Sequence, residues 1–354
     1  MRNFILKFGF ALNAGTAFLL LLANLAPIVP PDSFWPIAFF GLAFPYLVIV
    51  NVIFLAIWII WRSKKFLLPL VVILIGFNNI IDTVQFIPVS HLGEAGIKVL
   101  SYNVHNFKYY RKTPKSGTPK FLEYFKSVGS EIICLQEVTL YSNGKLSPQG
   151  IVDELPEINY FQRTKSNDIY SGLITFSKYP IINLGEIKFP GSSNLVIFSD
   201  IKINNDKIIR VYNCHLQSYS IDPDDYSVMN SSESEKEQIV KARKISYKLK
   251  AGFQLRAFQA RKVADHIRHS PYPVIVCGDF NDTPVSYAYK QVRGELKDSF
   301  VESGWGISNT YNGELPSFRI DYIFCDQKFK ASNYKRDRIT LSDHFPIHCE
   351  VKVD

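Results

Sequence analysis

Three long apolar stretches open the chain. They run from about Phe8 to Val29, from about Phe34 to Trp61 and from Phe66 to about Ile81. A helix needs about 20 apolar residues to cross the hydrocarbon core of a bilayer, and the first two stretches exceed that length. The pattern therefore predicts two membrane-spanning helices followed by a shorter third segment.

The third segment differs from the first two, because it is shorter and contains Asn78 and Asn79. We expect it to span, with a re-entrant or an interfacial segment as the alternatives. The first stretch has no clear small-residue cleavage pattern, and further apolar spans follow it at once, so we interpret it as a retained anchor rather than a signal peptide.

The basic residues around these stretches predict their orientation. Arg2 and Lys7 precede the first stretch, the turn before the second has none, and a basic cluster at 62–65 follows the second. Because basic residues favour the cytoplasmic side, the N-terminus and the second loop are expected in the cytoplasm. If the third segment spans, the remainder lies on the extracytoplasmic side, which is our prediction for this multi-pass chain; if it does not span, the remainder is cytoplasmic.

After residue 96 the pattern changes to short apolar runs separated by polar stretches. Such runs, rich in Val, Ile, Tyr and Phe, predict a mixed α/β domain. A helix is expected over Lys120–Val128. The predicted organisation is a membrane region over 1–89, a linker over 90–96 and a single domain over 97–354. The expected strands are IKVLSYNV, EIICLQEV, GLITFSKY, IIRVYNCHL, PVIVCGDF, RIDYIFC and PIHCEVKV.

One long segment, from Asp222 to His269, interrupts this rhythm of strands. It begins acidic and Ser-rich and becomes rich in Lys, Glu, Gln and Ala, which predicts a loop followed by helices. We expect Phe253, Phe258, Val263 and Ile267 to line one helix face against a sheet.

Charge and cysteine usage narrow the picture only slightly. Residues 1–89 hold five of the 40 basic and two of the 32 acidic residues, which leaves 35 and 30 for the remainder. This mild excess suits a phosphate-bearing substrate but falls short of the basic surface of a dedicated nucleic-acid binder. The five cysteines lie in apolar runs without metal-site spacing, so we expect buried free thiols.

Polar residues recur at the ends of the predicted strands, where open sheets present ligands and catalytic groups. Packing alone does not account for so many strand-end positions of one chemical type. Hydrolysis of a phosphoester needs a hard cation, oxygen ligands for it, an activated water and donors to the phosphoryl oxygens, and this set can supply all four. The residues are Asn103, Glu137, His215, Asp279, Asn281, Asp321, Asp343 and His344.

The segments around these residues resemble a known family. LSYNVHNF, CLQEV, NCHLQS, GDFNDTP, RIDYIF and SDHFPI are similar, in this order, to the signature segments of the endonuclease/exonuclease/phosphatase superfamily. The resemblance covers residues 97–354. It implies a four-layered α/β sandwich with two packed mixed sheets, and hydrolysis of phosphodiester or phosphomonoester bonds through a metal-activated water.

The same resemblance implies a metal site. Glu137 matches the principal metal ligand of the family, and Asn103 and Asp343 match residues close to the metal. Mg²⁺ is the expected ion, with Mn²⁺ as a possible substitute, because carboxylate and amide oxygens suit hard cations.

Catalytic roles are implied for the remaining residues of the set. Asp279 and Asn281 match the pair that orients the attacking water and the phosphate, and Asp321 matches the carboxylate that bonds to His344. We assign general-base work jointly to His344 and Asp279. His215 matches the histidine that donates to phosphoryl oxygens in the DNase I, sphingomyelinase and inositol-phosphatase branches.

One position departs from the apurinic-endonuclease branch. His105 stands where that branch has an Asp that assists metal binding. This places that branch and any second metal in doubt. His105 either contacts phosphate or fills a loop.

Three functions are compatible with this pattern. The first is a membrane-anchored, Mg²⁺-dependent phosphoesterase acting on nucleic acid, a lipid headgroup or a small phosphoester. The second is a non-catalytic binding protein of the same fold, and the third is a transporter, for which the apolar stretches offer no intramembrane charge pair. The basic and aromatic segment 109–115 could serve a nucleic acid or a lipid surface, or be a solvated loop.

Overall fold

The chain folds into two compact units. A computed structural model describes residues 2–87, 96–108, 119–139, 144–164, 172–219, 235–313 and 317–353. Unit 1 comprises residues 1–83, 217–261 and 283–291, and unit 2 comprises 84–216, 262–282 and 292–354. Most of the predicted linker, and the basic and aromatic segment 109–115, lie outside the described residues.

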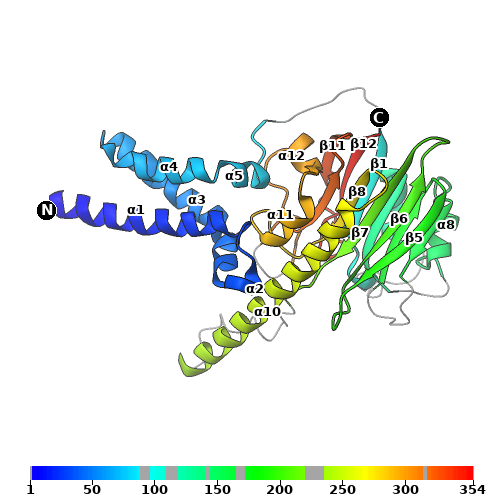
Figure 1. Cartoon of the computed structure of the whole chain (residues 1–354), viewed down its shortest axis with the longest axis horizontal. Helices are drawn as coiled ribbons and strands as arrows, with labels where there is room; N and C mark the ends of the chain where they lie inside the picture. The colour runs from blue at the N-terminus through cyan, green and yellow to red at the C-terminus, as the bar shows by residue number, and fades with distance from the viewer. Residues whose placement is uncertain are drawn as a thin grey trace. The chain divides into compact units, whose positions relative to one another are not determined.

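The N-terminal part of unit 1 is helical. Two helices, over Leu6–Leu25 and Pro36–Ile60, are long and apolar enough to cross a membrane. The pair α4 and α5 is bent by 60° and makes a third candidate span if it is counted as one. Figure 1 shows α1, α3 and α4 running side by side. The elements are α1 (Arg2–Leu25), α2 (Pro31–Phe34), α3 (Pro36–Ile60), η1 (Lys64–Phe66), α4 (Leu67–Ile75) and α5 (Phe77–Thr83).

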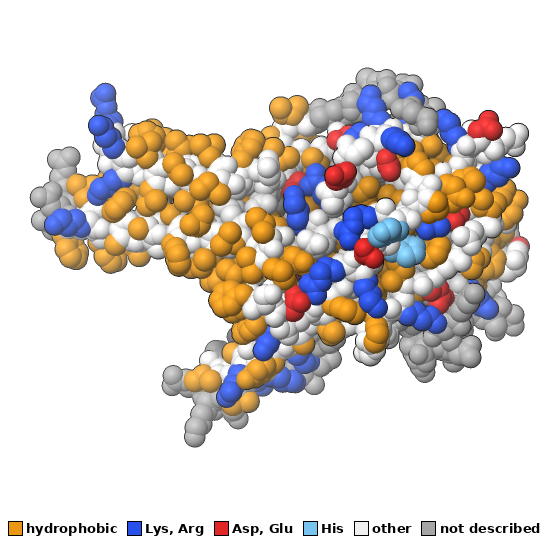
Figure 2. Space-filling model, viewed as in Figure 1, with side chains coloured by type: hydrophobic (Ala, Val, Ile, Leu, Met, Phe, Trp, Pro, Cys, Tyr) orange, Lys and Arg blue, Asp and Glu red, His pale blue; other side chains and the backbone are white. Residues whose placement is uncertain are grey.

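These helices bury small and large apolar side chains between them and turn other large apolar side chains outward. Ala17, Leu20 and Ala23 of α1 pack with residues of α3 and α4. Outward-facing side chains such as Phe18 and Leu74 are each 58% exposed, and Figure 2 shows hydrophobic side chains covering the surface of these helices. The buried positions also include large side chains, since Phe44 and Trp58 are each 1% exposed. An outer surface rich in large apolar side chains is compatible with a membrane anchor.

Unit 2 contains two six-stranded sheets. The first has the strand order β11-β12-β1-β2-β4-β3 and the second β5-β6-β7-β8-β10-β9. The pairs β1/β2 and β7/β8 are parallel and the other neighbours are antiparallel. Both sheets are therefore mixed, as the resemblance implied. The strands are β1 (Ile97–Asn103), β2 (Ile132–Val138), β3 (Tyr160–Arg163), β4 (Gly172–Ser177), β5 (Ile181–Lys188), β6 (Leu195–Lys202), β7 (Ile208–His215), β8 (Val274–Asp279), β9 (Lys297–Asp298), β10 (Asp321–Cys325), β11 (Lys330–Arg336) and β12 (Ile347–Lys352).

The structure confirms all seven expected strands and the helix over Lys120–Val128, and it adds five strands. Of these, β3 and β9 are short, and β5 and β11 are edge strands with mostly accessible side chains. In β6 a buried Asp200 interrupts the apolar run and pairs with Arg210 of β7 through two contacts of 2.6 and 2.8 Å. The remaining helices are η2 (His105–Phe107), α7 (Lys120–Val128), α8 (Pro148–Glu154), α10 (Glu235–Arg268), α11 (Tyr287–Arg293) and α12 (Ser299–Ser303).

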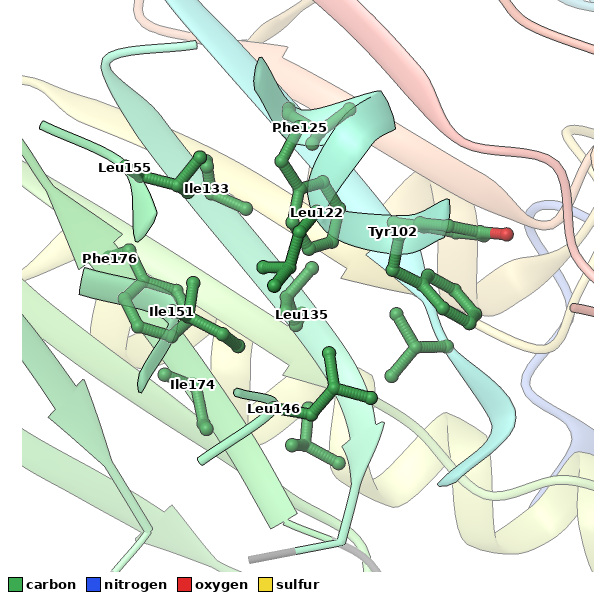
Figure 3. Close-up of a cluster of buried hydrophobic side chains, with 14 of the residues drawn as sticks. Tyr102, Leu122, Phe125, Ile133, Leu135, Leu146, Ile151, Leu155, Ile174 and Phe176 are labelled. Carbon is green, nitrogen blue, oxygen red and sulfur yellow. The ribbon is translucent and has the colours of Figure 1, made fainter. Parts of the chain in front are cut away.

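Alternate residues of β2 enter two different cores. Ile133 and Leu135 pack beneath α7 and α8 on the outer face of the first sheet (Figure 3). Ile132 and Cys134 point the other way, into the core that both sheets share. Because both faces are buried, the strand is a continuous apolar run rather than an alternating one. All five cysteines are buried and free, as expected.

The expectation for the segment after Asp222 was partly wrong. Its described part is one helix, α10, and not several. Phe253 is 2% and Val263 0% exposed, but Phe258 is 39% exposed. A spacing of five residues turns a helix by about 140°, so Phe253, Phe258 and Val263 cannot share one face. Phe253 moreover packs on Phe39 of α3, within unit 1, and not on a sheet.

A buried amide pair joins the two sheets. Gln136 of β2 donates through Nε2 to Asn213 Oδ1 of β7 at 2.8 Å. Asn213 Nδ2 donates in turn to the carbonyl oxygens of Leu135 and Ile174, at 3.1 and 2.9 Å. Both amide residues are fully buried. Their hydrogen bonds fix the register of one sheet against the other in an otherwise apolar core.

Replacing Asn213 by Ala is expected to lower stability, because it removes the 2.8 Å bond from Gln136 and the donor to two buried carbonyl oxygens. Gln136 Nε2 keeps Ser101 Oγ and the carbonyl oxygen of Cys134 as partners, each at 3.2 Å. The loss of buried hydrogen bonds of this kind costs about 1–3 kcal/mol, which corresponds to a fall in Tm of roughly 2–12 °C for a domain of this size. The measurement is thermal unfolding of the full-length protein in detergent, followed by intrinsic fluorescence. Asn159→Ala, which removes an exposed amide hydrogen bond, is the control, and equal Tm values for the two variants would contradict the assigned role.

Candidate active site

The topology of unit 2 brings the polar strand ends together. β1 and β2 run parallel, as do β7 and β8, so the carboxyl ends of each pair lie at one edge of their sheet. β10 runs antiparallel to β8, and its first residue, Asp321, pairs with the last residue of β8, Asp279. Asp343 and His344 precede β12, which runs antiparallel to β1. Residues from five strands and one loop therefore meet.

Asn103 links two carboxylates at the centre of this group. Its Nδ2 donates to Glu137 Oε1 at 3.1 Å and to Asp279 Oδ2 at 2.9 Å. Its Oδ1 accepts the backbone N–H of His105 at 3.1 Å. Asn103 is fully buried, so these three contacts fix the orientation of its amide and hold the two carboxylates close to each other.

Two of the site residues have left-handed backbone conformations. Glu137 has a φ of 50° and Asn281 a φ of 53°. Glu137 lies at a register shift in the pairing of β2 with β4, and such a bulge redirects a side chain out of the regular alternation. Left-handed conformations are uncommon outside glycine, and strained residues of this kind cluster at active sites.

Asn281 is held by three hydrogen bonds. Its backbone N–H donates to Asp279 Oδ1 at 2.8 Å, and its Nδ2 donates to Asp279 Oδ2 at 3.2 Å and to the carbonyl oxygen of Leu216 at 3.0 Å. Leu216 directly follows His215. Asn281 thus ties the end of β8 to the end of β7.

Asp279 is a carboxyl group without exposure to water. Burial raises its pKa to about 6, against the opposing attraction of His344 and His215. His344 Nε2 lies 3.7 Å from Asp279 Oδ2 and His215 Nε2 lies 3.9 Å from it. A pKa near neutrality allows this carboxyl to exchange a proton under physiological conditions.

His344 and Asp321 form a buried pair. His344 Nδ1 is 2.9 Å from Asp321 Oδ2, and the two residues are 5% and 1% exposed. Burial opposes the charged form of His344, but the carboxylates of Asp321 and Asp279 outweigh it and raise its pKa to about 10. His344 is therefore protonated at neutral pH and can donate from Nε2.

Asp343 is paired with His105, the residue whose role the sequence left open. His105 Nδ1 lies 2.8 Å from Asp343 Oδ1. This hydrogen bond raises the pKa of His105. Burial would raise the pKa of Asp343, but His105 and His344 outweigh it and lower that pKa. His105 also lies in a left-handed turn over His105–Phe107, with φ values of 43°, 54° and 51°, so it is held at the site rather than merely filling a loop.

His215 faces both carboxylates that Asn103 links. Its Nε2 is 3.4 Å from Glu137 Oε1 and forms no hydrogen bond among the described residues. A buried nitrogen without a hydrogen bond, aimed at two carboxylates, is an unusual arrangement in a folded protein. The Nε2 atom of His215 is therefore available to bind a further group at this face of the site.

The donor set fits a divalent cation. Glu137, His215 and Asp279 can each place a ligand atom within 4.8 Å of the others, and Asp279, Asp321 and His344 form a second such group. Only the first group has an accessible member, since the Glu137 side chain is 26% exposed, whereas the second is fully buried. Two carboxylates held together with an accessible oxygen match the preference of Mg²⁺ and Mn²⁺ for oxygen ligands.

Two residues of the site were missed from the sequence. Ser342 Oγ donates to the carbonyl oxygen of Asn103 at 2.8 Å and to Asp343 Oδ1 at 3.2 Å. Thr310 Oγ1 accepts the backbone N–H groups of Ile320 and Asp321 at 3.0 and 3.1 Å. The position of Ser342 beside the Asp-His pair was a usable signal. Thr310 lies in a polar stretch that carries no signal.

Replacing Asp321 by Asn is expected to lower the pKa of His344 from about 10 toward its ordinary value of 6.5, because Asp321 is the main group that raises it. The measurement is a pH titration of the histidine resonances by NMR in ¹⁵N-histidine-labelled protein. Asp326→Asn, in the turn after the same strand, is the matched control. A His344 pKa that stays near 10 in Asp321→Asn would mean that the pair does not set the charge of this imidazole.

Solved structures of low sequence identity share this fold. An endonuclease/exonuclease/phosphatase family protein from Bacteroides thetaiotaomicron matches with 16% identity and a TM-score of 0.50, over 76% of this chain and 100% of that one. The human Nocturnin catalytic domain with bound sulfate matches with 17% identity and a TM-score of 0.50, over 76% of this chain and 97% of that one. No curated protein sequence matches significantly.

Two family models match the sequence. Residues 3–83 match a domain of unknown function, DUF8431. Residues 100–344, more than half of the chain, match the endonuclease/exonuclease/phosphatase family, and all eight site residues that the sequence predicts lie within this range. The chain therefore belongs to the endonuclease/exonuclease/phosphatase family of hydrolases.

Proposed function

We propose that this chain is a membrane-anchored phosphoester hydrolase that requires a divalent cation, Mg²⁺ or in its place Mn²⁺. The observation that carries the proposal is the joining of Glu137 and Asp279 by one amide nitrogen of Asn103, at 3.1 and 2.9 Å. Carboxylates held this close repel each other, so a cation at the accessible edge of the pair is favoured.

Glu137 is the principal residue proposed to hold the cation, with Asn103 and Asp343 beside it. When bound, the cation supplies positive charge that offsets the negative charge developing on the phosphoryl oxygens. Support for including Asp343 comes from Ser342, whose Oγ contacts both the carbonyl oxygen of Asn103 and Asp343 Oδ1, at 2.8 and 3.2 Å.

The other residues divide the work of proton and phosphate handling. Asp279, with its pKa of about 6, is proposed to take the proton of the attacking water, and Asn281 to orient this carboxylate and the phosphate. His344 is proposed to donate to a phosphoryl oxygen, a role that its pKa of about 10 supports better than that of a base. His215 is proposed as a second donor. No covalent intermediate is required.

The alternative of a binding protein without turnover has less support. Loss of catalysis usually removes members of a catalytic set, whereas all eight predicted residues are present and at least seven of them contact another member directly. Nucleic acid, lipid headgroups and small phosphoesters all remain within the proposed substrate class. The segment 109–115, for which a nucleic-acid contact, a lipid contact and a solvated loop were all left open, lies outside the described residues.

Anchoring is proposed to be multi-pass, with the N-terminus in the cytoplasm and the catalytic residues on the extracytoplasmic side. Two candidate spans, and a third if the bent α4/α5 pair is counted as one, support more than one crossing. Lys and Arg residues at 62–65, between α3 and α4, support a cytoplasmic position for that turn.

The purified full-length protein in detergent is expected to hydrolyse at least one substrate from a panel of plasmid DNA, RNA, sphingomyelin, bis(4-nitrophenyl) phosphate and 4-nitrophenyl phosphate. Activity should require added Mg²⁺ or Mn²⁺ and vanish with EDTA. Glu137→Ala is expected to lower kcat/KM by on the order of 10³-fold, since it removes the principal cation ligand.

Glu157→Ala is the control for this experiment, because Glu157 pairs only with the surface residue Lys178 among the described contacts. Activity in Glu137→Ala equal to that of the control would contradict the proposed metal site. A well-folded protein that binds Mn²⁺ but cleaves no substrate would point to a narrow substrate outside the panel. A protein that binds no metal would favour the binding-protein alternative.

Single introduced cysteines test the membrane topology, with little background because the native thiols are buried. A membrane-impermeant maleimide on intact cells should label Ser33→Cys, between α1 and α3, and Asn205→Cys, between β6 and β7. It should label Ser63→Cys, between α3 and α4, only after permeabilisation. Labelling of Ser33→Cys but not of Asn205→Cys on intact cells would show that α4 and α5 do not cross.

A further inference from the structure

We propose that the N-terminal helices, besides anchoring the chain, position the catalytic residues, and that they do so through a contact between Gly41 of α3 and Val285. This inference rests on the proposed function, because it concerns the same Asp279, Asn281 and His215. Val285 and Gly41 are positioning residues and have no direct part in the chemistry.

The chain that follows β8, the strand that ends at Asp279, continues directly into a segment of unit 1. The stretch 262–282 of unit 2 ends at Asp282, and the next residues, 283–291, belong to unit 1 together with residues 1–83. Asn281 and Val285 are only four residues apart. Any displacement of Val285 is therefore passed along a short covalent path to Asn281, whose left-handed φ of 53° already depends on its surroundings.

Val285 is built into the core of the N-terminal helices. It is 2% exposed and packs in one apolar cluster with Leu20 of α1, Phe44 of α3 and Val72 of α4. A side chain held by three helices has little freedom to move. The helices thus fix the segment that follows the catalytic Asp-x-Asn motif.

Gly41 shows how closely the two backbones approach. A Cβ atom at position 41 would meet the carbonyl oxygen of Val285 and the Cβ atom of Ala26 at distances far below van der Waals contact. Only glycine at position 41 permits this approach, and any larger residue must push the Val285 backbone away. By contrast, a Cβ atom at Gly15 of α1 would meet nothing within 4 Å.

A second connection holds the strand that carries His215. Two residues after His215, the backbone N–H of Gln217 donates to Gln259 Oε1 of α10 at 2.8 Å, and its carbonyl oxygen accepts from Arg256 Nη1 at 2.6 Å. The same part of α10 is fixed to the N-terminal helices, since Arg261 makes two hydrogen bonds of 3.0 and 2.8 Å to Asp32. The chain after β7 and the chain after β8 therefore both continue into segments of unit 1.

The two connections meet at one hydrogen bond of the active site. Asn281 Nδ2 donates to the carbonyl oxygen of Leu216 at 3.0 Å. Leu216 lies one residue before the segment 217–261, and Asn281 lies two residues before the segment 283–291. A shift of either segment changes this contact and the orientation of Asp279. The effect should fall on catalytic geometry more than on substrate affinity.

The test compares Gly41→Ala with Gly15→Ala in the full-length protein in lipid nanodiscs. Three readouts are taken: kcat and KM for bis(4-nitrophenyl) phosphate, Mn²⁺ affinity by EPR, and hydrogen exchange of the amides at 279–282. Gly41→Ala is expected to lower kcat on the order of tenfold or more with a smaller change in KM, and to speed exchange at Asn281. Gly15→Ala should match the wild type in all three.

A second variant covers the case in which Gly41→Ala does not fold. Val285→Ala introduces no clash and removes only packing, so it should show the same changes in milder form. Equal kcat values and equal exchange in Gly41→Ala and Gly15→Ala would overturn the positioning role while leaving the proposed function intact. If the wild type binds no Mn²⁺ and hydrolyses nothing, the proposed function fails, and amide exchange at Asn281 alone still decides whether the helices hold this segment.

Discussion

The buried carboxyl group of Asp279 is the constraint on which the site depends. A carboxylate removed from water is strongly destabilised unless hydrogen bonds and opposite charges replace its hydration. Asn103 supplies one donor, Asn281 supplies two, and His215 and His344 stand 3.9 and 3.7 Å away. These partners come from strands of both sheets and from the segments next to them. The buried carboxylate of Asp279 therefore needs hydrogen bonds and charges that only the convergence of these strand ends can supply.

Local pattern explains why so much of unit 2 could be predicted. The buried strands are continuous apolar runs, their polar ends carry the predicted site residues, and α7 has a strong apolar face, so each signal lies within a few neighbouring residues. The amide pair of Gln136 and Asn213 left no such signal, because its function exists only once the two sheets are packed. The left-handed conformation of Glu137 was equally invisible, since a bulge depends on the pairing of β2 with β4.

Unit 1 could also be predicted only in part, because its long-range contacts leave no local signal in the sequence. The apolar stretches predicted the helices. Nothing near Val285 indicated that it packs among Leu20, Phe44 and Val72. The single-face expectation for α10 failed because five-residue spacing was taken for helical spacing, and because Phe253 packs on Phe39 rather than on a sheet. Contacts between segments some 200 residues apart in sequence are set by the fold and not by the neighbouring residues.

The discontinuity of unit 1 bears on how such a chain can be divided or recombined. Its three stretches, 1–83, 217–261 and 283–291, form one compact body although two of them lie within the sequence of the catalytic domain. A fragment beginning at Gly96 would keep the last two stretches and expose Val285 and Phe253, which the first stretch now covers. Exchanging residues 1–83 for an unrelated helical segment would do the same. Because these three stretches share one apolar core, a functional chimera would have to preserve the side chains that the first stretch packs against the other two.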